Sequence, residues 1–112
     1  MCKFIHLRNA HNMSRGGMTI AFDTIPQPDG SLVVEAALAI CSTRDNFNRR
    51  LGRAISEGRL RKGVAIRMTA PPEISISDVV ADLRQAGVEM MEAYGMVAAE
   101  RPMSASEKGL VT

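Results

Sequence analysis

Two apolar segments joined by a short turn place the strongest constraint on the fold. Residues 18–25 are rich in β-branched and aromatic side chains, and residues 32–41 alternate between two sets that are both mostly apolar. The linker between them, Pro26-Gln27-Pro28-Asp29-Gly30, reads as a turn because proline stops strand pairing and Asp-Gly supplies a positive φ. The pattern predicts an antiparallel hairpin whose second strand lies inside a sheet, although an alanine-rich run such as 32–41 is also compatible with a helix.

The segment from Cys41 to Gly63 reads as a strand end followed by a capped helix. Ser42 and Asp45 have the spacing of a capping box, and an apolar stripe follows at helical intervals. Gly58 or Gly63 is the expected stop. The stripe, which we expect to face the core, consists of Phe47, Leu51, Ala54 and Ile55.

Positive charge is concentrated in this same helix. The segment 44–63 has seven basic and two acidic residues, a net charge of +5, whereas the whole chain carries only +2. Residues 73–112 have a net charge of −4, with seven acids and three bases. The expected basic surface consists of Arg44, Arg49, Arg50, Arg53, Arg59, Arg61 and Lys62.

The rest of the chain predicts a third strand and a second helix. Residues 64–68 alternate as a strand that Pro71 and Pro72 end. Ser75 and Asp78 form a second candidate capping box, and the helix after it stops at Gly87 or continues to Gly95. The predicted fold is therefore α+β, in the order hairpin, basic helix, third strand, second helix. We expect both helices to cover one face of a small sheet and the other, apolar face to favour a homodimer.

Both ends of the chain lack a clear period. We expect residues 1–17 to be a flexible extension, and the purine-rich codons of an Arg-Gly-Gly before Met18 raise the hypothesis that translation begins there. Residues 18–95 are expected to form one domain, and residues 96–112 a disordered tail.

The sequence shows no catalytic signature, so we expect a non-enzymatic protein without cofactor or metal. There is no Ser/His/Asp or Cys/His set, P-loop or dinucleotide motif. Cys2, His6 and His11 would make only a partial metal site, and Cys41 is expected to be an inert thiol. With two widely spaced cysteines and no signal peptide or apolar run of membrane-spanning length, the expected location is cytoplasmic.

An arginine-rich helix favours a polyanionic partner, either nucleic acid or an acidic protein, but it is also compatible with a solvated surface. Aromatic residues make up only 4% of the chain, which disfavours base stacking and leaves contacts to phosphates. A helix start at Ser42 and Thr43 could also hold one phosphate of a small anionic nucleotide.

Residues 39–60 resemble a segment of small bacteriophage and prophage proteins, in which Cys-Ser, Asp and Phe are followed by a basic pair, Gly-Arg and Gly-Arg-Leu. The resemblance covers about a fifth of the chain. It implies a viral accessory protein that acts in bacterial cytoplasm, where it binds nucleic acid or inhibits a host or defence protein.

Overall fold

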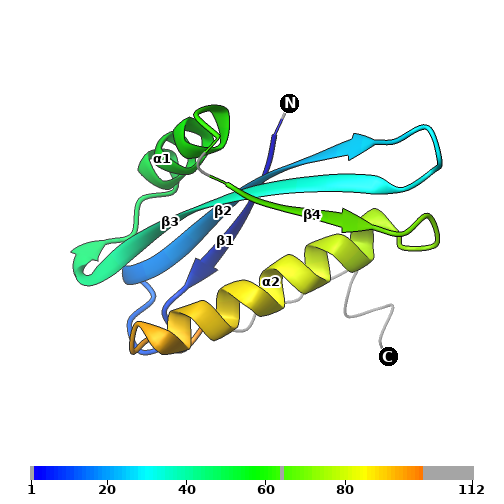
Figure 1. Cartoon of the computed structure of the whole chain (residues 1–112). Helices are drawn as coiled ribbons and strands as arrows, with labels where there is room; N and C mark the ends of the chain where they lie inside the picture. The colour runs from blue at the N-terminus through cyan, green and yellow to red at the C-terminus, as the bar shows by residue number, and fades with distance from the viewer. Residues whose placement is uncertain (1, 64, 100–112) are drawn as a thin grey trace, which may run out of the picture.

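The chain forms a four-stranded antiparallel sheet with two helices, and a computed structural model describes residues 2–63 and 65–99 of it (Figure 1). The strands lie in the order β1-β2-β3-β4 across the sheet. This confirms the α+β class and the predicted order of hairpin, helix, strand and helix. The elements are β1 (Lys3–Arg8), β2 (Arg15–Pro26), β3 (Leu32–Asn46), α1 (Arg49–Arg61), β4 (Ile66–Ala70) and α2 (Ile76–Ala93).

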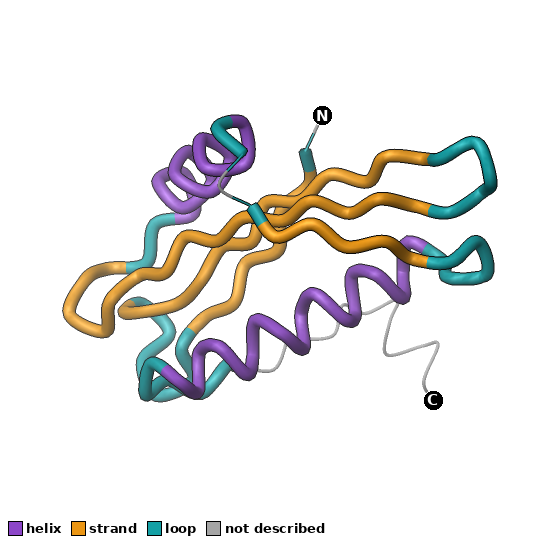
Figure 2. The backbone as a smooth tube through the Cα atoms, viewed as in Figure 1, coloured by secondary structure: helices purple, strands orange, loops and turns teal. Residues whose placement is uncertain are grey.

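The predicted hairpin is formed by β2 and β3, and its far end projects beyond α1 (Figure 2). In the turn, the Gln27 amide donates to the Ser31 carbonyl at 2.8 Å, and Gly30 has a φ of 89°. The Asp29 carboxylate accepts hydrogen bonds from the Ser31 hydroxyl and amide, which lower the pKa of this carboxyl. β3 is an interior strand, as predicted, because β2 and β4 pair with its two sides.

The two helices lie on opposite faces of the sheet rather than sharing one face as predicted (Figure 1). Side chains alternate along β2, so Thr19 and Ile20 point to different faces. Gly52 of α1 lies against Thr19, whereas Gly87 of α2 lies against Ile20. Residues of both faces of β2 are buried, among them Thr19 on one face and Ile20 on the other, as expected when each face is covered by a helix.

The main core lies between α2 and the sheet. The capping box at Ser75 is confirmed, because the Asp78 amide donates to the Ser75 hydroxyl and the Asp78 carboxylate accepts from the Ser75 amide. The helix continues through Gly87, which lets α2 approach the sheet closely. Its apolar stripe joins a cluster of buried residues, which are Ile5, Leu7, Met18, Ile20, Phe22, Val34, Ala36, Val79, Leu83, Met91 and Met96.

The prediction of a flexible extension over residues 1–17 is wrong. Residues 3–8 form β1, an edge strand that pairs in register with residues 17–22 of β2. Ile5 and Leu7 are only 4% and 2% exposed, so this strand contributes to the core. The folded domain therefore includes residues on the N-terminal side of Met18, and the predicted boundary at residue 18 is not the edge of the domain.

The prediction of a disordered tail is also wrong for its first residues. Met96 is buried, and Ala98 forms an isolated bridge with Asn9. The Ala10 amide donates to the Val97 carbonyl at 2.7 Å, and these bonds hold the chain beside the end of β1. Residues 100–112 of the predicted tail lie outside the described residues.

Candidate functional site

The basic helix begins later than predicted. Residues 42–46 continue β3, and the Phe47 amide donates to the Ser14 carbonyl at 2.8 Å. The N-cap is Asn48, whose side chain accepts from the Leu51 amide at 3.1 Å. The predicted cap at Ser42 is therefore wrong, because residues 42–46 extend β3, Asn46 pairs with Arg15, and the helix starts only after Asn48.

The predicted anion site at a helix start is not formed by Ser42 and Thr43. Both residues lie in β3, seven and six positions before Arg49, the first residue of α1. The Ser42 hydroxyl accepts a hydrogen bond from the Arg44 amide at 3.2 Å. The free amide groups of a helix N-terminus are thus absent from this position.

The face that α1 buries consists of small residues. Ser56 is 0% exposed, and its hydroxyl donates to the Gly52 carbonyl at 2.7 Å. By contrast, Leu51 is 56% and Ile55 is 39% exposed. The predicted stripe is therefore only partly correct. Phe47 packs against β1 and β2, whereas Leu51 and Ile55 lie at the margin of the helix and line a hollow beside Thr19 and Ala39. Gly52 meets the sheet instead, because it lies directly against the Thr19 side chain with no room for a Cβ.

The structure divides the predicted basic residues into free and engaged groups. Arg59 donates to the Leu38 carbonyl at 2.6 Å, and Arg61 forms an ion pair with Glu57. That pair is the one salt bridge within residues 2–63 and 65–99. The other five predicted basic residues are exposed, and their side chains have neither a carboxylate partner nor a hydrogen bond in this part of the chain; they are Arg44, Arg49, Arg50, Arg53 and Lys62.

The edge strand β1 brings further basic and aromatic side chains to the same place. The Arg8 guanidinium lies 4.9 Å above the ring centre of Phe47, and the His6 ring meets Phe47 edge-on at 6.1 Å. Gly17 makes room for this ring, because a Cβ there would lie 2.6 Å from Phe47. The predicted packing role of Phe47 thus holds against residues of β1 and β2.

The environment of His6 is polar and positively charged. Its Nδ1 lies 2.9 Å from the Thr19 hydroxyl. Burial lowers the pKa of His6, and the positive charges of Arg49, Arg53 and Arg8 lower it further. Three arginines from two elements therefore act on one imidazole, and its lowered pKa leaves it mostly neutral at pH 7.

Sequence reasoning missed His6 and Arg8 as site residues because residues 1–17 were assigned to a tail. The available signal was the alternation in 3–8, where apolar Ile5 and Leu7 alternate with polar His6 and Arg8. A six-residue strand with one polar face would have been sufficient to place both polar side chains on one face.

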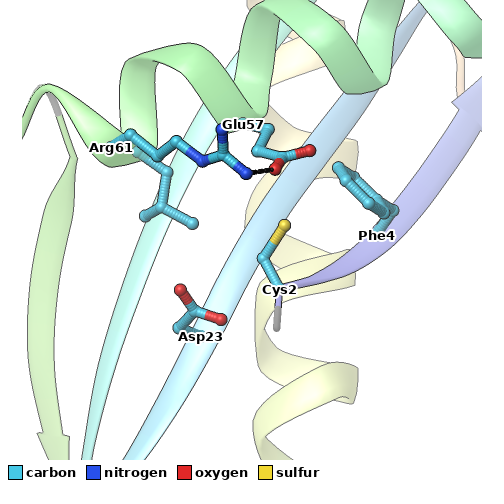
Figure 3. Close-up of a pocket in the computed structure, with 6 residues that line it drawn as sticks. Cys2, Phe4, Asp23, Glu57 and Arg61 are labelled. Atoms are coloured by element: carbon cyan, nitrogen blue, oxygen red, sulfur yellow. Dashed lines mark hydrogen bonds and ion pairs between the residues drawn. The ribbon is translucent and has the colours of Figure 1, made fainter.

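A second space between α1 and the sheet holds the carboxylates of Asp23 and Glu57, and Glu57 is paired with Arg61 (Figure 3). A pocket of about 500 Å³ is lined there by Cys2, Phe4, Asp23, Glu57, Leu60 and Arg61. Burial raises the pKa of the Cys2 thiol, and the carboxylates of Glu57 and Asp23 raise it further. The thiol is therefore protonated at neutral pH and is a poor nucleophile.

The partial metal site considered for Cys2, His6 and His11 is not assembled. Within the described residues, no group of three His, Cys, Asp or Glu side chains is arranged to hold a metal ion. Cys41 lies in β3 and not at a helix start, and its sulfur lies 3.5 Å from the carbonyl oxygens of Ser42, Asp45 and Asn46.

Comparisons with protein-family models, with curated proteins and with solved structures found no match to this chain. Neither helix in the described ranges combines the length and apolar character needed to cross a membrane.

Proposed function

We propose that this protein is a non-catalytic nucleic-acid-binding protein that contacts the phosphate backbone. The observation that carries the proposal is a group of arginines near the start of α1: Arg49 and Arg53 are exposed on the helix, and Arg8 lies over the ring of Phe47, two residues before it. The charges of all three lower the pKa of His6. No carboxylate in the described part of the chain pairs with any of them. These three arginines together with Arg50 are called the basic surface below.

The chemistry of the basic surface fits phosphate esters. A guanidinium group remains charged at any physiological pH and can donate two parallel hydrogen bonds to one phosphate. Arg49 and Arg50 are the first two residues of α1, where the helix dipole adds partial positive charge. Binding of this kind releases counterions and weakens as the salt concentration rises.

Not all seven basic residues predicted from the sequence are expected to contact nucleic acid. Arg59 and Arg61 are held by Leu38 and Glu57, so they support the structure of α1 and its contact with β3. Arg44 and Lys62 are exposed beyond the two ends of α1 and extend the basic surface. Arg15 joins Arg44 at one end, because its guanidinium donates to the Arg44 carbonyl at 2.8 Å.

An acidic protein, such as a host or defence protein of the kind that the phage resemblance implies, is the competing partner for the same surface. Phosphates and carboxylates both attract guanidinium groups, but only nucleic acid binding scales with oligonucleotide length and type. The competing partner is favoured if oligonucleotides do not bind at low salt.

The test is a fluorescence-anisotropy titration with short single- and double-stranded DNA and RNA at several salt concentrations. We expect binding with a steep salt dependence, and reversal of Arg49 and Arg53 to glutamate should abolish it. Each lost contact to duplex DNA should reduce the slope of log affinity against log salt by about 0.9. Unchanged affinity in that variant would remove the basis of the proposal.

A matched control reverses two arginines elsewhere. Arg67 lies in β4, and Arg84 lies in α2 on the opposite face of the sheet from α1. The variant Arg67→Glu/Arg84→Glu has the same net charge as Arg49→Glu/Arg53→Glu. The control variant should retain most of the binding, because its arginines lie away from the basic surface. Equal weakening of both variants would instead indicate a nonspecific effect of net charge.

A further inference from the structure

We infer that the exposed apolar side of α1 and the neighbouring edge of β3 dock a second copy of this chain around a two-fold axis. This inference does not rest on nucleic-acid binding, because it concerns the flank of α1 away from His6. The apolar side, called the α1 stripe below, consists of Leu51, Ala54, Ile55 and Gly58.

The α1 stripe has the composition of a buried helix face but no partner in the described chain. Its members have i, i+3, i+4 and i+7 spacing, as in a helix that packs on another element. Leu51 and Ile55 are 56% and 39% exposed, and no atom lies within 4 Å of a Cβ built at Gly58. The sheet is instead contacted by Gly52 and Ser56, so the stripe is free to meet another molecule.

An open strand edge lies beside the α1 stripe. β4 pairs with residues 32–36 of β3, and no described strand pairs with that side of residues 37–41. The Leu38 carbonyl on this edge already accepts from Arg59 at 2.6 Å, so an added strand would pair with the other backbone groups of the edge or displace this bond. Exposed edges of this kind accept a further strand through backbone hydrogen bonds.

A hollow joins the α1 stripe to the strand edge. It has a volume of about 370 Å³, and its wall includes Ala39, Ile40 and Cys41 from β3 and Leu51 and Ile55 from α1. The apolar part of the hollow therefore links Leu51 and Ile55 of the helix to Ala39 and Ile40 of the strand, and polar residues, among them Ser42, Asp45 and Asn48, line the rest of it. A partner that adds a strand at β3 would also cover Leu51 and Ile55.

The opposite charges of Asp45 and Lys62 at the two ends of the stripe fit a second copy of this chain as the partner. Asp45, exposed, lies in the wall of the hollow at the N-terminal end of α1, and Lys62, exposed, caps the C-terminal end. A two-fold axis across the stripe makes the two α1 helices antiparallel and brings Asp45 near the partner's Lys62. One surface then serves both copies, as an isologous dimer requires.

The small residues on the stripe and the direction of the helices support this arrangement. Ala54 and Gly58 are four residues apart, which allows close approach of two helix backbones. Antiparallel helices place opposite ends of their dipoles side by side. Arg49 and Arg53 lie on the other flank, near His6, and the dimer leaves them uncovered.

Sedimentation equilibrium of the full chain over a wide concentration range tests the inference. We expect twice the mass of one chain at high concentration and at least a tenfold weaker self-association for Leu51→Glu/Ile55→Glu. The control is Ile76→Glu, because Ile76 is 42% exposed, similar to Ile55, but begins α2. The control should associate as the native chain does.

A charge exchange gives a second test that does not depend on apolar residues. Asp45→Lys and Lys62→Asp should each weaken the dimer, and the double variant should restore it. Circular dichroism spectra confirm that each variant is folded. The inference is overturned if the native chain remains monomeric throughout, if Leu51→Glu/Ile55→Glu associates normally, or if the double charge variant is no stronger than the single ones.

Discussion

The helices α1 and α2 lie on opposite faces of one sheet but bury different kinds of surface. α2 buries large apolar side chains, including Leu83 and Met91, and forms one wall of the core. α1 buries Gly52 and Ser56 and leaves Leu51 exposed. The contrast between these buried surfaces shows that an apolar stripe on a helix does not by itself indicate which face of the helix meets the sheet. The shape of the strand surface beneath the helix also decides.

The two helices also differ in charge. α1 contains five arginines and one glutamate, whereas α2 contains four acidic residues and one arginine. Two of the arginines of α1, Arg49 and Arg53, have no carboxylate partner in the described chain, and their charges act on His6 of β1 together with that of Arg8. We therefore expect α2 to contribute mainly to stability, and the proposed binding depends mainly on α1.

The largest expected effect on stability comes from truncating Leu83 of α2, and truncation of Leu51 of α1 provides the comparison. Leu83→Ala should lower the free energy of unfolding by about 2–5 kcal/mol, because it leaves a cavity between α2 and the sheet. Leu51→Ala should change it by less than about 0.5 kcal/mol in dilute protein, because this side chain is mostly exposed. Urea unfolding followed by circular dichroism measures both. Equal costs would contradict the division between the helices.

Two glycines within α1 sharpen the comparison. Gly52→Ala should cost about 1–3 kcal/mol, because the new Cβ would overlap the Thr19 hydroxyl. Thr19 is fully buried and bonded to His6, so it cannot move aside easily. Gly58→Ala should instead stabilise the dilute protein by about 0.5–1 kcal/mol, since the helix gains an alanine and nothing obstructs it.

The same unfolding measurement checks both glycine variants. The structure requires the two substitutions to change the free energy of unfolding in opposite directions. Helix propensity alone would predict that alanine stabilises the helix at both positions. A gain in stability at Gly52 would show that α1 does not approach the sheet closely.

The caps of the two helices should contribute similar, smaller amounts. Asn48→Ala and Ser75→Ala each remove a side chain that accepts a first-turn amide hydrogen bond. Each should cost about 1 kcal/mol in thermal or urea unfolding. If Ser42→Ala rather than Asn48→Ala proved costly, α1 would begin at the predicted position instead of the observed one.

The smallest expected effect is the pH dependence that His6 introduces. The folded protein holds the pKa of His6 below its ordinary 6.5, so the unfolded chain binds more protons as the pH falls. The free energy of unfolding should be insensitive to His6 above pH 6.5 and should decrease below it, until the folded-state pKa is reached. A pH series of thermal unfolding for the native chain and for His6→Gln isolates this contribution. A native chain that gained stability from His6 on acidification would contradict it.

Much of the fold follows from local sequence patterns. Alternation and turn residues predicted the β2–β3 hairpin, and the Ser75 capping box marked the start of α2. Each of these signals lies within a few consecutive residues, and their physical causes are equally local.

The remaining features depend on residues far apart in the sequence. β1 was not predicted because a six-residue strand has too short a pattern to be recognised alone. Only its pairing with β2 buries Ile5 and Leu7 and makes it part of the sheet. The start of α1 was misplaced because Ser42 and Asn48 both fit a cap, and only pairing of Asn46 with Arg15 excludes the first. The site near His6 could not be predicted from the sequence, because its residues come from β1 and from the observed start of α1, and both of these elements were misassigned.

The most direct test of the account is an NMR titration of the labelled protein with a short oligonucleotide at low salt. We predict that the amide signals of α1 and β1 shift, that the pKa of His6 rises as phosphates neutralise its arginine neighbours, and that the amide signals of α2 remain in place. Shifts concentrated in α2, or no shift in α1 and β1 at any oligonucleotide concentration, would contradict the assignment of binding to the basic surface.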